Sequence, residues 1–192
     1  SVLDLETGEL TTLGGPDAKP STMQFAKFSP DSSKVAYVSE ADIFVEDVTN
    51  GDIVQLTRRY NESIINGIMS WAYEEEFSIR DGFRWSPDGS MIAFWQLDAS
   101  DVGEFYMINN TDSLYSKMIP VQYPKVGTTN SAARVGVISL GTGNITWIKI
   151  PGDPRMNYIA GMEWAAGSRE LIIQHMNRLQ NVITVYLARA AD

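Results

Sequence analysis

The chain has 192 residues, of which 44% are hydrophobic and 20% charged, a composition typical of one folded domain rather than a disordered segment. Its net charge of −9 disfavours nucleic-acid binding, and the absence of cysteine excludes disulfides, thiol catalysis and cysteine-ligated zinc. With His175 as the single histidine, the sequence predicts neither a metal site nor a cofactor. No apolar run reaches the ~18 residues that a membrane-spanning helix needs.

The first residues already follow a strand pattern. Residues 1–13, SVLDLETGELTTL, predict two short strands joined by a turn. We therefore expect residues 1–13 to be the end of a repeating unit, and the chain to be a fragment of a longer protein.

Residues 22–57 predict one complete unit of about four short antiparallel strands. The unit contains FSPDSSKVAYV from Phe28, DIFVED at 42–47 and IVQLT at 53–57. Between the last two strands, Asn50-Gly51 is the dipeptide most typical of a tight hairpin turn.

The aromatic turn at Phe28 recurs twice. WSPDGSMIAFW begins at Trp85 and WAAGSRELIIQ begins at Trp164, and each is followed by a further predicted strand, at 104–110 and 182–188. Ser-Pro-Asp-Gly at 86–89 suits a type I turn, in which proline fixes φ at the second position. We expect one or more units over 82–150, a partial unit over 157–192, and insertions at 58–81 and 110–131.

Repeats of ~40–50 residues with four strands each are typical of β-propeller blades. A closed propeller needs ~4–8 blades, and this chain holds fewer, so the predicted fold is all-β: a partial β-propeller of about three to four blades of four-stranded antiparallel sheet. The insertion at 58–81 is predicted to hold a short helix. A two-sheet β-sandwich has the same alternation of strands and turns and remains an alternative.

The insertion at 58–81 contains WAYEEEF, in which Glu74, Glu75 and Glu76 lie between aromatic residues. On a strand, adjacent carboxylates would point to opposite faces, whereas on a helix they diverge by ~100° and can reach one pocket. Ser70 is placed to cap such a helix, and Arg80 lies four residues beyond Glu76.

Two convergent carboxylates suit an ammonium group, which has three donors and one compact positive charge. Calcium generally needs ~6–8 oxygen ligands, and no aspartate-rich loop supplies them here. Glycoside acid–base chemistry requires carboxylates on opposite sides of a bond, which adjacent residues hardly achieve. A solvated helix face with no ligand is the simplest alternative. Glu75 and Glu76 are the candidate binding residues, with Glu74 as structural support.

Three segments resemble one known family. NGIMSWAYEEEF (66–77), RWSPDGSMIAFWQLD (84–98) and YPKVGTTN (123–130) are similar to the propeller domain of the dipeptidyl peptidase IV family, within the prolyl oligopeptidase superfamily. This resemblance implies an eight-bladed propeller combined with an α/β-hydrolase domain that removes N-terminal dipeptides after proline or alanine. It also implies that Glu75 and Glu76 bind the free α-ammonium of a peptide substrate.

The chain departs from the family where catalysis is concerned. It contains no Gly-x-Ser-x-Gly motif, and His175 lies in an apolar strand pattern, LIIQHMN, so we expect no catalytic residue and no hydrolase domain here. The spacing after the glutamates and the lack of cysteine resemble bacterial rather than animal members. The predicted partners are peptides with a free N-terminus, the hydrolase domain of the same protein, and further copies bound through exposed blade edges. A non-catalytic propeller that binds peptides or proteins is the alternative function.

Overall fold

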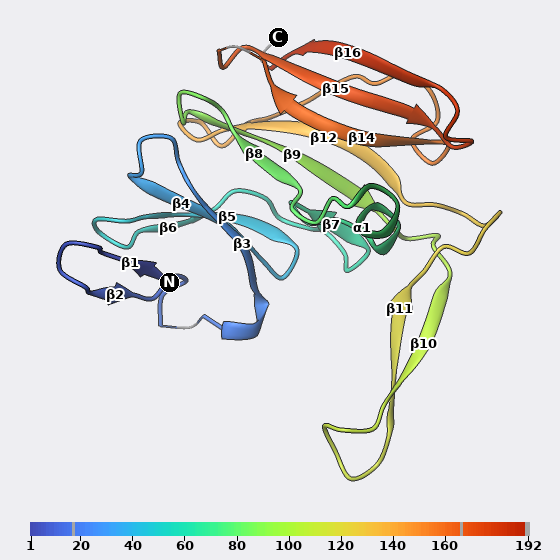
Figure 1. The fold of residues 1–192 in the computed structure, drawn as a ribbon, viewed down its shortest axis with the longest axis horizontal. Helices are drawn as coiled ribbons and strands as arrows, with labels where there is room; N and C mark the ends of the chain where they lie inside the picture. Colours follow the sequence, from blue (N-terminus) through green and yellow to red (C-terminus); the bar gives the residue numbers. More distant parts are fainter. Residues whose placement is uncertain (17, 166, 191–192) are drawn as a thin grey trace.

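The computed structural model describes residues 1–16, 18–165 and 167–190, which form mainly β-strands (Figure 1). In chain order the strands are β1 (Val2–Leu3), β2 (Leu10–Thr11), β3 (Met23–Phe28), β4 (Lys34–Ser39), β5 (Asp42–Asp47), β6 (Ile53–Gln55), β7 (Ile64–Asn66), β8 (Phe83–Trp85), β9 (Met91–Asp98), β10 (Glu104–Asn109), β11 (Lys117–Gln122), β12 (Ala132–Ser139), β13 (Ile145–Trp147), β14 (Asn157–Trp164), β15 (Glu170–Asn177) and β16 (Ile183–Arg189). A short 3-10 turn, η1 (Pro20–Thr22), precedes β3, and the helix α1 (Trp71–Phe77) lies between β7 and β8.

Three antiparallel sheets follow one another along the chain, from blue through green to red in Figure 1. The first has the order β3-β4-β5-β6, the second β13-β12-β9-β7 with β8 also paired to β9, and the third β14-β15-β16. The hairpins β1-β2 and β10-β11 form separate two-stranded sheets. The prediction of a nearly all-β, partial propeller with one short helical insertion is confirmed.

The middle sheet is covered on both faces, which distinguishes this arrangement from a two-layer sandwich. Along β9, Ile92 and Phe94 pack with the first sheet, whereas Trp95 and Leu97 pack with the third. Alternate residues of one strand point to opposite faces, so β9 needs the continuous apolar run that the sequence provides. Stacking of successive sheets in this way is the packing of propeller blades.

Strands β7 and β8 together form the first strand of the middle sheet. Both pair with β9, from Ile64 opposite Asp98 to Asn66 opposite Gln96, and then from Phe83 opposite Phe94 to Trp85 opposite Ile92. They therefore lie in line along one partner, with residues 67–82 as an excursion between them. With β7 and β8 counted as one strand, the middle sheet has four strands. Like those of the first sheet, they pair in chain order.

The first strands of the other two sheets are irregular at nearly the same place. The register shifts between Gln24 and Lys27 in β3, and between Ile159 and Gly161 in β14. Beta-bulges are common next to functional sites because they redirect the chain without ending the strand. The excursion that carries α1 is thus located where each repeat already departs from regular pairing.

The repeated turn has a common set of hydrogen bonds. The hydroxyl of Ser29 donates to Asp31 (2.6 Å) and that of Ser86 donates to Asp88 (2.7 Å). These bonds help to lower the pKa of both carboxyls, that of Asp31 to about 2. The Ser-Pro-Asp sequence thus forms the same serine–aspartate hydrogen bond in both turns.

The aromatic residue of each repeat links one sheet to the next. The indole N–H of Trp85 donates to the carbonyl of Lys27 (3.1 Å), and that of Trp164 donates to the carbonyl of Arg84 (3.2 Å). Lys27 and Arg84 directly precede the aromatic residues of their own repeats. Each tryptophan thus bonds to the equivalent position of the preceding sheet, and the side chain of Asp81 adds ion pairs to Lys27 and Arg84.

One predicted strand has a different partner from the one expected. Residues 104–110 were expected as a strand of the repeating unit, but among the described strands β10 pairs only with β11, and their hairpin projects from the body of the protein (Figure 1). The third strand of the middle sheet is instead β12. The prediction was wrong because an apolar run such as FYMI identifies a strand but not its neighbours; Phe105 and Met107 are in fact exposed.

Among the described residues, no helix has both the length and the hydropathy needed to cross a membrane.

We predict that Gly82→Ala destabilises the chain by about 1–3 kcal/mol, because the new methyl group would clash with backbone atoms. A Cβ at Gly82 would lie 2.8 Å from the carbonyl carbon of Gly67, whereas a Cβ at Gly103 would meet nothing within 4 Å. Gly103→Ala is therefore the matched control. Urea unfolding followed by tryptophan fluorescence measures both free energies, and equal effects of the two substitutions would contradict the close approach.

Candidate functional site

Helix α1 begins after Ser70, which has an extended backbone with φ −77° and ψ 163°. The carbonyl of Ser70 accepts hydrogen bonds from the N–H groups of Tyr73 (3.0 Å) and Glu74 (3.1 Å). Its hydroxyl makes no capping bond, and its buried Oγ has no partner among the described residues. The sequence therefore predicted the position of the cap correctly but not its side-chain hydrogen bond.

The helix ends at Phe77, where Ser78 adopts the left-handed conformation with φ 55°. The N–H of Ser78 donates to the carbonyl of Tyr73, a common way of closing a helix. Arg80 consequently lies outside α1, so the expected helical spacing between Glu76 and Arg80 is wrong. This helix end carries no glycine signal, because serine occupies the left-handed position.

One side of α1 is fixed to the third sheet. Ala72 and Tyr73 are buried and Phe77 is half-buried, and the rings of Tyr73 and Phe77 lie 5.8 and 5.1 Å from that of Tyr158. The hydroxyl oxygen of Tyr73 accepts a hydrogen bond from the N–H of Ile159 (3.0 Å). Burial raises the pKa of Tyr73 well above its usual value, so this hydroxyl stays protonated at any ordinary pH.

The three glutamates of α1 are exposed to solvent. Glu74, Glu75 and Glu76 are all exposed, and none of their carboxylates has a hydrogen bond or ion pair within the described part of the chain. With roughly 100° between successive residues, Glu75 and Glu76 lie on either side of the buried Ala72, whereas Glu74 lies farther round the helix. The structure therefore places two neighbouring, unneutralised carboxylates on a helix whose other side is held rigidly.

The start of α1 has a second contact that the sequence did not indicate. The ring of Trp71 lies 4.1 Å from that of Tyr123, the first residue of the YPKVGTTN segment. In the sequence these residues are far apart and both simply read as aromatic. Only the similarity of both segments to one family connected them.

His175 lies in β15, where its ring is 5.8 Å from that of Tyr186 in an edge-on arrangement. Its Nε2 is buried and has no hydrogen-bond partner among the described residues. A catalytic histidine needs a hydroxyl or thiol on one side and an orienting carboxylate on the other. Within the described ranges neither group is bonded to His175, whose ring packs against that of Tyr186.

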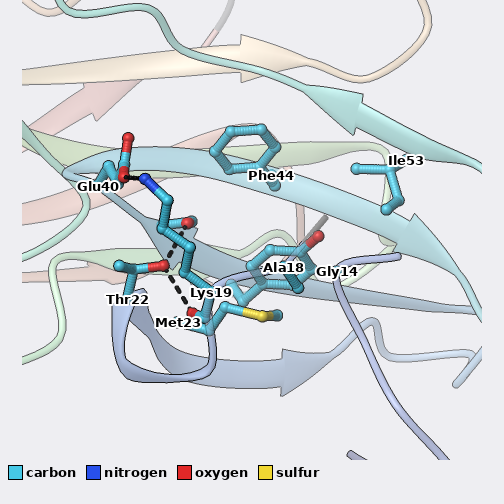
Figure 2. Close-up of a pocket in the computed structure, with 10 residues that line it drawn as sticks. Gly14, Ala18, Lys19, Thr22, Met23, Glu40, Phe44 and Ile53 are labelled. Atoms are coloured by element: carbon cyan, nitrogen blue, oxygen red, sulfur yellow. Dashed lines mark hydrogen bonds and ion pairs between the residues drawn. The ribbon is translucent and has the colours of Figure 1, made fainter. Parts of the chain in front are cut away.

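A cavity of about 290 Å³ lies elsewhere, between residues 14–23 and strands β4 and β5 (Figure 2). Met23, Phe44 and Ile53 line it, and Lys19 forms an ion pair with Glu40 (3.1 Å). It contains no residue of α1 and no paired carboxylates. Across the described ranges, no group of three or more histidine, aspartate or glutamate side chains is arranged to hold a metal ion.

Tyr73→Phe tests whether α1 is anchored as described. Removing the hydroxyl leaves the buried N–H of Ile159 without an acceptor, so we expect a loss of about 1–3 kcal/mol in the free energy of unfolding. Amide hydrogen exchange at Ile159 should accelerate as well. Tyr158→Phe, which keeps the ring contacts, is the control, and an unchanged exchange rate at Ile159 in Tyr73→Phe would contradict the anchor.

Comparison with known proteins extends this description. The inactive dipeptidyl peptidase 10 of Mus musculus is 29% identical over 194 aligned residues, which cover 98% of this chain and 24% of that protein. Dipeptidyl aminopeptidase B of Saccharomyces cerevisiae is 31% identical over 169 residues, which cover 84% of this chain and 20% of that protein. The chain thus spans about a fifth to a quarter of the length of these curated relatives.

Among solved structures, the dipeptidyl peptidase 4 of Porphyromonas gingivalis is similar, with a TM-score of 0.80 and 32% identity over 86% of this chain and 24% of that one. The family described as "Dipeptidyl peptidase IV (DPP IV) N-terminal region" matches residues 1–192. The resemblance noted in the sequence is therefore confirmed, and the chain belongs to the dipeptidyl peptidase IV N-terminal region family.

Proposed function

We propose that this chain is the propeller portion of a dipeptidyl peptidase IV-like serine exopeptidase, and that Glu75 and Glu76 bind the α-ammonium group of a peptide substrate. The observation that carries the proposal is the pair of exposed, unneutralised carboxylates on a helix anchored by Tyr73. The parent protein removes N-terminal dipeptides of the Xaa-Pro or Xaa-Ala type. This part holds the substrate and controls its access, while a hydrolase domain supplies the serine nucleophile, so the chain alone is inactive.

The chemistry of the two ends of a peptide explains the selectivity. A free α-ammonium has a positive charge and three N–H donors, which two carboxylates can accept together. An internal peptide nitrogen has no charge and at most one donor, so it leaves the carboxylates unpaired. A fixed distance from this pair to the nucleophile then sets cleavage after the second residue.

A non-catalytic propeller that binds peptides or proteins is the second candidate. It is favoured by the similarity to a mouse protein named as an inactive dipeptidyl peptidase. The two candidates predict different sequence motifs in the rest of the parent protein. A Gly-x-Ser-x-Gly motif followed in order by aspartate and histidine supports the enzyme, and its absence supports the binding module.

Glu75→Gln and Glu76→Gln test the ammonium site in the full-length protein. Each change keeps the shape of the side chain and removes its charge, so we expect kcat/KM on an Xaa-Pro substrate with a free amine to fall roughly 10- to 100-fold. Glu74→Gln is the matched control, because Glu74 lies farther round the helix, and should leave kcat/KM within about twofold. Unchanged kinetics in both Glu75→Gln and Glu76→Gln would exclude the proposed role.

We also propose that the isolated chain self-associates through its third sheet. On β16, Ile183, Val185 and Leu187 are 56%, 63% and 63% exposed, and β16 pairs only with β15 among the described strands. Such an apolar face with an open edge is prone to bind another copy. Sedimentation should show oligomers of the wild-type chain and monomers of the Val185→Lys/Leu187→Lys variant. A wild-type chain that stays monomeric at high concentration would contradict this.

A further inference from the structure

The contact between Trp71 and Tyr123 joins the glutamate-bearing helix to a different part of the chain. Their ring centroids are 4.1 Å apart with an interplanar angle of 43°, and Trp71 is the first residue of α1. Because Glu75 lies four residues beyond Trp71, the two side chains share one face of the helix. A rotation of α1 that moves the Trp71 ring therefore also changes the direction of the Glu75 carboxylate.

Tyr123 is held in place by contacts that do not involve α1. Its N–H donates to the carbonyl of Gly103 (2.8 Å), which closes the base of the β10-β11 hairpin. The side-chain amide of Gln122 donates to the carbonyl of Ala99 (2.8 Å), and the ring of Phe105 lies 5.9 Å from that of Tyr123. These bonds hold Tyr123 on the side of the hairpin base.

The segment after Tyr123 is fixed at its other end as well. The guanidinium of Arg155 donates to the carbonyl of Asn130 (3.0 Å), and that of Arg178 donates to the carbonyl of Thr128. Arg178 lies just after β15, in the third sheet, and Arg155 just before β14. Residues 123–130 are thus held at both ends by elements that do not belong to α1.

Helix α1 needs such a support because its contacts through Ala72, Tyr73 and Phe77 do not reach the side on which Trp71 lies. It has only seven residues, and Ser70 provides no side-chain cap. Tyr73 and Phe77 hold the opposite side, but a helix held along one line can still rotate about it. Helices this short gain little stability of their own, so tertiary contacts determine their orientation.

We propose that Trp71 and Tyr123 are positioning residues for the carboxylate pair: the contact between their rings fixes the rotation of α1, and so the direction in which Glu75 and Glu76 present their oxygens to an ammonium group. This inference rests on the proposed function of Glu75 and Glu76. Neither ring touches the substrate in this role. Each acts through the helix, and the YPKVGTTN segment provides the fixed side of the contact.

The test uses the full-length protein and two probes, the dipeptide Ala-Pro and its N-acetyl derivative. The ratio of their inhibition constants measures how strongly the site prefers a free ammonium. Trp71→Ala and Tyr123→Ala should each reduce this ratio about tenfold, because a misdirected carboxylate no longer meets the ammonium. Tyr123→Phe keeps the ring and should restore the ratio to within about twofold of the wild type. A loss of folded protein would lower the maximal rate of all reactions but not the ratio.

Tyr115→Ala is the matched control, since Tyr115 lies in the loop of the same hairpin, between β10 and β11, and is 81% exposed. It should leave the ratio unchanged. If Tyr123→Ala does not fold, Tyr123→Leu removes the aromatic ring while keeping an apolar side chain. An unchanged ratio in Trp71→Ala, together with an unchanged ratio in Tyr123→Ala or Tyr123→Leu, would overturn the positioning role. Glu75→Gln then separates the two proposals. If it lowers the ratio while the aromatic variants do not, only the positioning role fails. If it leaves the ratio unchanged as well, the proposed function fails.

Discussion

The first strand of the middle sheet leaves β9 after Asn66 and returns to it at Phe83, and the whole site depends on how this gap is closed. The N–H of Gly67 donates to the carbonyl of Trp95 (3.1 Å), the N–H of Trp95 to that of Gly82 (2.9 Å), and the N–H of Gly82 to that of Gly67 (2.8 Å). The two ends of the excursion thus bond to each other and to β9. Because these three N–H groups keep acceptors at the point where the chain leaves the sheet, a helix can be inserted there without leaving them unpaired.

The same region links the helix to the third sheet through Ile159. Its N–H donates to the Tyr73 hydroxyl (3.0 Å), and its carbonyl accepts from the indole N–H of Trp95 (3.0 Å). Ile159 lies at the register shift of β14, where the backbone bends out of regular pairing. The irregularity in one sheet therefore anchors both the helix and the central strand of the neighbouring sheet. Because Tyr73 and Trp95 are fully buried, these bonds are formed in an environment where losing them is costly.

Much of this organisation was visible in the sequence. The repeated aromatic turns and the four strands of each repeat predicted propeller blades. WAYEEEF predicted a short helix, because adjacent carboxylates can reach one pocket from a helix and Ser70 is placed to cap it. What failed were statements about partners. The Ser70 side-chain cap and the Glu76–Arg80 spacing failed locally, at the two ends of α1, whereas the expected membership of 104–110 in a blade depended on how distant segments meet. Local propensity contains no information on that, and the Trp71–Tyr123 contact was invisible for the same reason.

The exposure of the glutamates limits what this part can achieve alone. Three adjacent carboxylates in water cost the chain little, because hydration and salt screen their repulsion. For the same reason an ion pair formed there is worth only about 0–1 kcal/mol, too little to select one end of a peptide. The proposed selectivity requires that water be removed from around Glu75 and Glu76 when the substrate binds, since charge-assisted hydrogen bonds strengthen as the local dielectric falls. A surface beyond this chain must provide that cover, so the anchored helix would supply the direction of the carboxylates and the rest of the parent protein the strength of the interaction.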